Sequence, residues 1–351
     1  MTLQETIAAV RGADESAREL ARHRWDSLAK PLGSLGVLEE MVTRIAALTG
    51  SADVALRDRV LLVLCADNGV VARGVSQSDA SVTAAVAAAL GADSSTVNYM
   101  ARGAGCRVLP VDLGVLDFPG APGVLSRRIR NGAADITRGP AMTRAECVRA
   151  IETGIALAEE QTARGVSILL TGEMGIGNTT TSCAVACALL NGSPQALAGR
   201  GAGLSDAGFA RKVRAIRQAL RVNDPDPADP VDVLQKVGGL DIAGLCGVCL
   251  GGALCRVPVL LDGLIATVAA LCAVRLCPPA RDALLASHVS AEPAAQMILD
   301  ELGLSGPISA GLRLGEGGGA VAALPLLDMA LRVYGSGHTF GALGIDAYTP
   351  Q

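Results

Sequence analysis

VSILLTGEMGIGNTTTS, residues 166–182, is the stretch that indicates the fold, because an apolar run passes through a glycine-rich turn into the polar start of a helix. From about residue 59 onward, similar short apolar runs alternate with alanine-rich stretches of helical length. These runs are RVLLVLC (59–65), CRVLPVDL (106–113), VSILLTG (166–172), RVPVLLDG (256–263), ALLASHV (283–289) and ISAGLRLG (308–315). Unbroken apolar strands joined by helices are typical of a parallel sheet with helices on both faces, so we predict an α/β fold.

The composition is that of an ordinary globular protein with a large core: 351 residues, of which 50% are hydrophobic and 18% are charged. A formal net charge of −4 and 2% aromatic residues disfavour nucleic-acid binding, which needs a basic surface and rings for stacking. Glycine or charged residues interrupt the apolar stretches before they reach the roughly 20 residues of a membrane span. The N-terminal 25 residues lack the apolar centre of a signal peptide, so we expect a cytoplasmic protein.

The remaining segments differ from this alternating pattern. Residues 1–55 have a helical pattern that is broken within AKPLGSLGVLEE (29–40), where proline and glycine interrupt it. Residues 114–145 are rich in proline and glycine and are expected to be irregular, and residues 222–234 are an acidic, proline-rich connector.

Ten cysteines in a chain of this length do not indicate a disulfide framework. Most lie in apolar surroundings, such as Cys183 and Cys187 in TTSCAVACALL, and are expected to pack as small hydrophobic residues. The spacing of Cys246, Cys249 and Cys255 would suit a metal or a redox pair, but none of the three histidines lies in that segment. We therefore favour core packing for these cysteines and expect no metal site.

Carboxylates beside glycine follow five of the six apolar runs, at the strand ends where open parallel sheets bind ligands. The residues that follow the runs are Asp67, Asp112, Glu173, Asp262, Ser287 with His288, and Glu316. Aspartate is common in such loops as a turn former and helix cap, and we favour that interpretation for Asp112 and Asp262. Glutamate is a poor turn residue, so Glu173 and Glu316 are the stronger candidates for a site.

The loop from Gly172 keeps the frame of a nucleotide-triphosphate loop, but Asn178 stands where the phosphate-clamping lysine would be. Without that lysine a triphosphatase is disfavoured. Backbone amides of residues 175–177 and the hydroxyls of Thr179 and Thr180, at a helix start, suit a single ester phosphate.

A second glycine-rich stretch, ALAGRGAGLSDAGFARKV (196–213), contains Gly203 and Lys212. Its glycine spacing alone is a weak indication of a phosphate-binding loop. Enzymes that use a phosphoribosyl diphosphate bind it with Mg²⁺ through an acidic pair followed by a characteristic loop, and the sequence has no such motif. The sequence therefore implies no metal.

A ribose 5-phosphate that carries a leaving group at C1′ would suit this set of residues. Displacement at C1′ develops positive charge on the sugar, which a nearby carboxylate stabilises. A second carboxylate can act as general base toward the attacking group. The spacing of the two glutamates does not prove that they meet.

The chain resembles the nicotinate-nucleotide:dimethylbenzimidazole phosphoribosyltransferases, which make the α-ribazole phosphate of cobamide lower ligands. Eight segments carry the resemblance in the family's order over nearly the full length. They are KPLGSLGVLE, ADNGVVARGVS, TGEMGIGNTTTS, GRGAGLSD, DVLQKVGGLDIAGLCG, PVLLDG, ASHVSAE and LRLGEGGGA. The resemblance implies a Rossmann-like domain over 56–319, a smaller helical domain from 1–55 and 320–351, and a homodimer.

The resemblance also implies roles for individual residues. Glu316 would be the general base, and Glu173 would line the ribose and the reaction centre. The phosphate and ribose would contact Gly175, Gly177, Asn178, Thr179, Thr180, Gly203, Lys212 and Ser290, and the acceptor base would contact Asp67, Ser78, Ala80, Met174 and Leu314. Nicotinate mononucleotide is a substrate, so no cofactor is implied.

The chain departs from the family in the loop that follows the first strand. Asn68 stands where a histidine is usual, and Ala80 stands where a base-contacting glutamine is expected. These changes leave two alternatives open. The acceptor could be a phenolic or other non-standard compound, or the chain could be a weakly active subunit of a heteromeric transferase. A dinucleotide-binding oxidoreductase is disfavoured, since CADNG replaces the glycine fingerprint after the first strand.

Overall fold

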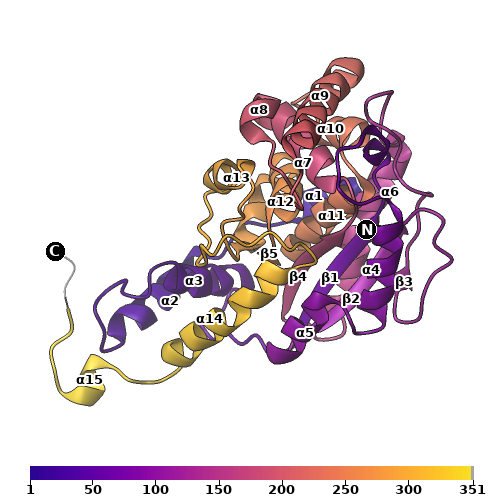
Figure 1. Cartoon of the computed structure of the whole chain (residues 1–351). Helices are drawn as coiled ribbons and strands as arrows, with labels where there is room; N and C mark the ends of the chain where they lie inside the picture. The colour runs from indigo at the N-terminus through magenta and orange to yellow at the C-terminus, as the bar shows by residue number, and fades with distance from the viewer. Residues whose placement is uncertain (349–351) are drawn as a thin grey trace.

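The computed structural model describes residues 1–348, and its centre is a parallel sheet with helices on both faces (Figure 1). Within these residues the sheet has six strands in the order β3-β2-β1-β4-β5-β6. Their bounds are β1 Arg59–Ala66, β2 Arg107–Gly114, β3 Leu125–Ser126, β4 Ile168–Met174, β5 Val259–Leu261 and β6 Leu284–Ala286. This is the strand order of a doubly wound nucleotide-binding sheet, so the predicted α/β fold with a Rossmann-like sheet is confirmed.

The order reverses between β1 and β4, and this reversal locates the ligand crevice of the sheet. In register, Val60 of β1 faces Arg107 of β2 on one side and Leu169 of β4 on the other. At the carboxyl ends Cys65 pairs with Met174, so the loop that follows β1 and the loop that follows β4 leave the sheet side by side. The glycine-rich stretch at 172–179 thus begins at the switch point.

The helices connect the strands and cover both faces of the sheet. Their bounds are α1 Leu3–Ala9, α2 Glu15–Ser27, α3 Val37–Thr49, α4 Ser81–Gly91, α5 Thr96–Gly103, α6 Arg144–Thr162, α7 Asn178–Leu190, α8 Pro194–Leu197, α9 Asp206–Asn223, α10 Pro230–Val237, α11 Leu240–Cys255, α12 Leu264–Leu276, α13 Ala294–Leu302, α14 Gly318–Tyr334 and α15 Phe340–Leu343, with 3-10 turns η1 Gly69–Arg73 and η2 Pro278–Ala283. Among residues 1–348, none of the helices has both the length and the hydrophobicity of a membrane span.

Two hydrophobic clusters form, one on each face of the sheet. Alternate residues of β1 divide between them: Leu62 and Leu64 belong to the cluster under α6, α7, α11 and α12, and Leu61 and Val63 to the cluster under α2, α3, α5 and α14. Because successive side chains of a strand point to opposite faces, a strand buried on both faces is apolar throughout. This explains the unbroken run RVLLVLC.

The helices from the two ends of the chain pack together beside the sheet (Figure 1). Trp25 of α2 stacks against Tyr334 of α14 with ring centroids 4.8 Å apart, and the Tyr334 hydroxyl donates to the Ala52 carbonyl at 2.9 Å. Helix α1, by contrast, packs on α6 and α11. The α2, α3 and α14 helices share one hydrophobic cluster with the sheet, and the division into two domains stays a prediction.

The structure corrects two expectations about strands. Residues 308–315 form no strand: Ile308 makes only an isolated bridge to His288, and Gly311 and Gly315 have φ of 63° and 78°, outside the extended region. Conversely, residues 114–145 were expected to be irregular, but Leu125–Ser126 within them forms the short edge strand β3. Two residues are too few for an alternating pattern to be visible in the sequence.

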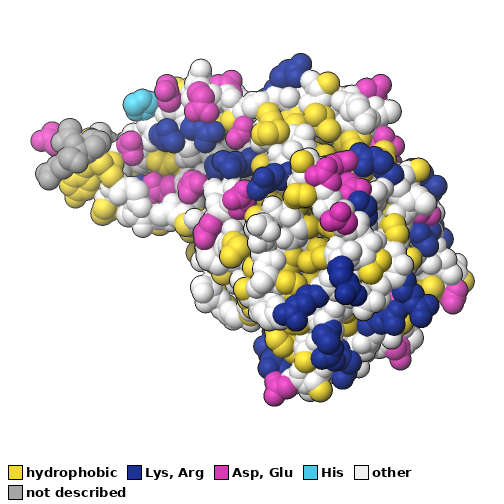
Figure 2. Space-filling view, turned by 90° about the horizontal axis from the view of Figure 1, so that it is seen from above, with side chains coloured by type: hydrophobic (Ala, Val, Ile, Leu, Met, Phe, Trp, Pro, Cys, Tyr) yellow, Lys and Arg dark blue, Asp and Glu magenta, His cyan; other side chains and the backbone are white. Residues whose placement is uncertain are grey.

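The cysteines pack in the core as predicted. All ten are free, nine are buried, and Cys255 is half-buried. Figure 2 shows that the face seen from above mixes basic, acidic and hydrophobic side chains.

Glycines let α6 and α11 approach each other very closely. A Cβ on Gly247 of α11 would lie 1.9 Å from the Ile151 carbonyl oxygen, and a Cβ on Gly154 of α6 would lie 2.0 Å from the Gly244 carbonyl oxygen. Gly244, Gly247 and Gly251 recur at helical spacing, so the contact follows one face of α11.

Gly247→Ala should therefore lower the free energy of unfolding by about 1–3 kcal/mol, the usual cost of overpacking a core. Gly103→Ala is the matched control, because Gly103 is exposed at the end of α5 and a Cβ there meets nothing within 4 Å. Urea unfolding of both variants measures the difference. Equal midpoints for the two variants would contradict the close approach of α6 and α11.

Candidate active site

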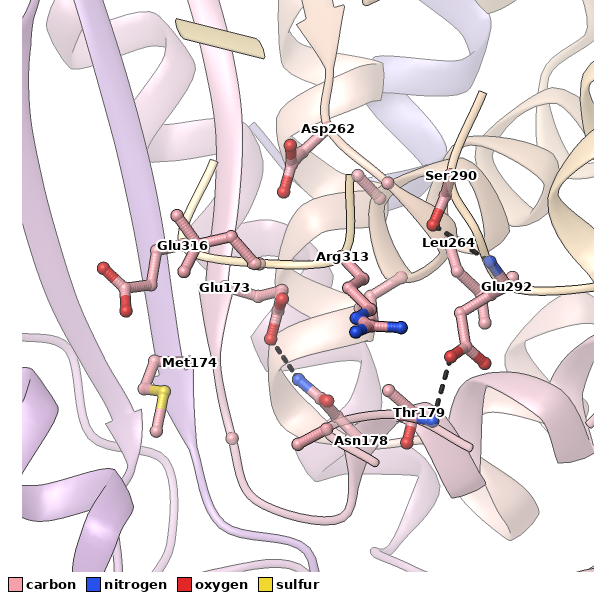
Figure 3. A pocket seen from close by; sticks show the side chains of 18 of the residues that line it. Glu173, Met174, Asn178, Thr179, Asp262, Leu264, Ser290, Glu292, Arg313 and Glu316 are labelled. Atoms are coloured by element: carbon pink, nitrogen blue, oxygen red, sulfur yellow. Dashed lines mark hydrogen bonds between the residues drawn. The ribbon is translucent and has the colours of Figure 1, made fainter. Parts of the chain in front are cut away.

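A cavity lies at the carboxyl ends of β4, β5 and β6 and is closed by residues 312–316 (Figure 3). Of the residues that the sequence singled out, Glu173, Met174, Gly175, Gly177, Asn178, Thr179, Ser290, Leu314 and Glu316 line it. The two glutamates, which are 143 positions apart in the chain, thus share one cavity.

Glu316 is held by an unusual backbone turn before α14. Its φ is 58°, in the left-handed region, between Gly315 at 78° and Gly317 at 90°. Left-handed backbone favours glycine, so a glutamate there is strained and the glycines beside it are required by the turn. The Glu316 N–H donates to the Glu173 carbonyl at 3.2 Å, and its carboxylate accepts the Val97 N–H at 3.4 Å.

The close approach of this turn to β4 depends on Gly172. A Cβ on Gly172 would lie 2.6 Å from the Glu316 carbonyl oxygen. The glycine of TGEMG therefore allows the two glutamate-bearing segments to touch.

Asp262, at the end of β5, caps α14 from outside the helix. Its carboxylate accepts N–H groups from Gly317 at 3.2 Å, Gly319 at 2.8 Å and Ala320 at 3.3 Å. Burial raises the pKa of Asp262 to about 6, although these hydrogen bonds oppose the shift. The interpretation of Asp262 as a helix cap is correct, but the helix that it caps begins 56 positions later.

Glu173 is buried among other carboxylates. The Asn178 side-chain amide donates to the Glu173 carboxyl group (Figure 3) and also, at 3.0 Å, to Asp241. Burial first, and then the charge of Asp241, raise the pKa of Glu173 to about 8, with smaller contributions from Asp262 and Glu316. The carboxyl group therefore holds a proton at neutral pH in the protein alone.

The loop before α7 is packed tightly. A Cβ on Gly175 would lie 2.2 Å from the Ala66 carbonyl oxygen, and Gly177 has φ of 94°. The Ile176 N–H donates to the Thr83 hydroxyl, so one of the backbone amides expected to hold the phosphate, at 175–177, already has a partner. The next amide, of Asn178, donates to the Gly175 carbonyl. Thr180 is fully buried and does not line the cavity, which leaves Thr179 as the hydroxyl at its wall.

Lys212 reaches the cavity indirectly, through Thr179. Its side chain is fully buried, and its ammonium donates to the Thr179 hydroxyl at 2.9 Å and to the Gly199 carbonyl at 3.0 Å. Burial lowers the pKa of Lys212. Gly203, with φ of 109°, accepts a hydrogen bond from Gln77 through its carbonyl and lies outside the cavity wall.

The predicted acceptor residues divide into two groups. Met174 and Leu314 line the cavity, whereas Asp67, Ser78 and Ala80 do not, and Ser76 lines it instead. The Asp67 carboxylate accepts the Leu116 N–H at 2.8 Å, and burial raises its pKa. Asn68 is buried beneath the loop, where its side-chain oxygen accepts the Thr181 hydroxyl at 3.2 Å.

Several lining residues were not proposed from the sequence for this site. They include Asp262, Leu264, His288, Glu292 and Arg313. Asp262 and His288 follow apolar runs in the sequence, and their position at strand ends could have indicated that they belong to the site. Glu292 and Arg313 lie within the segments ASHVSAE and LRLGEGGGA, but their residue types and spacing indicated no role, and only the folded chain brings them to the cavity.

Comparisons with known proteins agree over nearly the whole chain. A family model described as phosphoribosyltransferase matches residues 10–345. A nicotinate-nucleotide–dimethylbenzimidazole phosphoribosyltransferase of Ruminiclostridium cellulolyticum is 43% identical over 350 residues, covering 100% of this chain and 99% of the relative. One from Roseiflexus sp. is 43% identical over 344 residues and covers 98% of each chain.

A solved structure is similar as well. The crystal structure of CobT from Thermus thermophilus superposes with a TM-score of 0.89 at 39% identity, covering 94% of this chain and 99% of that one.

The raised pKa of Glu173 has a consequence for stability. A carboxyl group whose pKa is raised by folding stabilises the protein fully below its ordinary pKa of 4.5, and that contribution is lost as the pH rises toward about 8. Glu173→Gln removes the titration, so the variant should gain stability relative to the unchanged protein between pH 5 and pH 8, on the order of 1.4 kcal/mol per pKa unit. Urea unfolding across this range measures the gain. The exposed Glu19→Gln is the control, and parallel curves for Glu173→Gln and the unchanged protein would contradict the shift.

Proposed function

Because the chain belongs to the family of nicotinate-nucleotide–dimethylbenzimidazole phosphoribosyltransferases, we propose that it transfers the 5-phosphoribosyl group of nicotinate mononucleotide to a lower-ligand base such as 5,6-dimethylbenzimidazole. The products are the α-ribazole 5′-phosphate and nicotinate. The chain is a glycosyltransferase that acts on small molecules. The observation that carries this proposal is the meeting of Glu173 and Glu316 in one cavity beside a glycine-rich helix start.

The phosphate end of the donor belongs beside Thr179 and the 199–203 loop. Lys212 supplies the positive charge there through its hydrogen bond to the Thr179 hydroxyl. A lone buried ammonium with glycine-rich backbone around it suits an ester phosphate that stays on the sugar. Gly203 and Thr180 act by shaping the loop and the helix start.

Glu173 is placed for the ribose. The donor brings a pyridinium cation, and the sugar gains further positive charge as the bond from C1′ to the ring nitrogen breaks. A nearby cation favours the ionised carboxylate, so donor binding lowers the pKa of Glu173 and releases its proton. The resulting carboxylate stabilises the positive charge at C1′.

Glu316 takes the proton of the incoming base. The base nitrogen forms its bond to C1′ on the face opposite nicotinate, whose ring nitrogen keeps the electron pair of the broken bond. The leaving ring becomes neutral and needs no acid. The left-handed turn fixes the backbone of Glu316, which shares the cavity with Met174 and Leu314, and these two residues would contact the acceptor.

We further propose that the reaction requires no metal or cofactor, because carboxylates balance the charge at C1′ and the pyridine ring of the leaving nicotinate is neutral. From the resemblance we also expect a homodimer that acts in the cytoplasm.

Incubation of the purified chain with nicotinate mononucleotide and a panel of benzimidazoles, purines and phenols tests the function. We expect nicotinate release with a benzimidazole, an α-glycosidic product by NMR, and an unchanged rate in excess EDTA. Release only with phenols would reassign the acceptor. No release by the chain alone, together with release after a related chain is added, would make it a subunit of a heteromer.

Glu316→Gln should bind nicotinate mononucleotide with little change but lower kcat by roughly 10²–10⁴-fold, the usual contribution of a general base. Calorimetry measures binding, and nicotinate release measures the rate. The amide is isosteric with the carboxyl group, so the turn keeps its shape. Undiminished turnover would remove Glu316 from the role of base.

A further inference from the structure

A carboxylate occupies the side of the phosphate cradle that faces the loop after β6. Glu292 Oε1 accepts the Gly201 N–H at 2.9 Å, and the Glu292 N–H donates to the Ser290 hydroxyl at 3.4 Å (Figure 3). Glu292 Oε2 is buried and has no hydrogen-bond partner among the described residues. A Cβ on Gly199 would lie 2.0 Å from this Oε2, so the carboxylate lies directly on the glycine backbone.

The cradle that Glu292 touches is positively polarised. Lys212 is buried there and hydrogen-bonds to two neutral oxygens, of Thr179 and Gly199. Burial lowers the pKa of Lys212, and the negative charge of Glu292 acts in the opposite direction and raises it. A Cβ on Gly201 would meet the Thr179 hydroxyl oxygen at 3.1 Å and the Lys212 ammonium at 3.8 Å, so the amide that Glu292 holds belongs to the same cradle.

An anionic oxygen that accepts a glycine N–H beside a buried lysine makes the contacts of a phosphate oxygen. Two anions in one cradle repel each other, and a buried carboxylate oxygen without a donor is unfavourable. Glu292 is therefore poorly placed as a permanent partner of a bound phosphate.

We propose that Glu292 takes the place of the donor's 5′-phosphate when no donor is bound, and that the phosphate displaces it. The inference rests on the proposed function, since it concerns the same cradle. When the phosphate displaces the Glu292 carboxylate, the hydrogen bond between the 199–203 loop and the 290–292 loop is broken. The contact between these two loops therefore depends on whether the donor is bound. Displacement also makes Glu292 a specificity residue: a doubly charged phosphomonoester competes with the carboxylate, whereas a neutral riboside cannot.

Glu292→Gln tests this directly, because the amide keeps an acceptor for the Gly201 N–H and removes only the charge. Inorganic phosphate and nicotinate mononucleotide should each bind the variant on the order of tenfold more tightly, as expected for removing a like charge within the cradle. Isothermal titration calorimetry with each ligand measures this. Asp300→Asn on the exposed face of α13 is the charge control and should bind both ligands as the unchanged protein does.

Unchanged or weaker phosphate binding by Glu292→Gln would overturn the inference, since a merely structural Glu292 cannot improve affinity when it is altered. These measurements need no acceptor base and no turnover. If phosphate binds both proteins equally, the role of Glu292 fails while the transferase proposal stands. If the proteins bind phosphate as inferred but no acceptor releases nicotinate, the transferase proposal fails alone.

Discussion

The contact between the end of β4 and the turn before α14 is the constraint on which the site depends. Gly172 has no side chain, and the turn at 315–317 therefore lies against the strand with a hydrogen bond from Glu316 to the Glu173 backbone. On the other side, a Cβ on Gly317 would lie 2.3 Å from Leu61 of β1. The turn therefore packs against both central strands of the sheet, β1 and β4. Glu173 follows Gly172 and Glu316 lies in the turn itself, so the contact sets the backbone positions of both glutamates.

The cavity contains more acidic than basic side chains, although its proposed donor is an anion. Glu173, Asp262, Glu292 and Glu316 line it, with Arg313 as a cation at the wall and Lys212 behind Thr179. This balance suits the reaction that we propose, because positive charge would develop at C1′ and carboxylates would lower its energy. The phosphate needs only a small positive region, and burial strengthens a single ammonium there because little water screens it.

Much of the fold could be predicted because it depends on patterns repeated along the chain. A β1 buried on both faces is apolar throughout, and a glycine-rich turn marks the end of β4. The short β3 and the non-strand at 308–315 could not be predicted, since one has two residues and the other is set by left-handed glycines. In the site, glutamates among glycines were visible. Glu292 and Arg313 lie in segments that carry the family resemblance, but their place at the cavity could not be predicted, because it depends on how separate loops meet in space.

Asp262 links the site to the helices from the two chain ends. It holds the first turn of α14, a helix of 17 residues and thus about 25 Å in length, whose far end packs through Tyr334 on Trp25. The turn that carries Glu316 directly precedes this helix, so one continuous segment runs from the wall of the cavity to the buried Trp25–Tyr334 pair. The packing of the two chain ends and the anchoring of that turn are therefore parts of one structural unit.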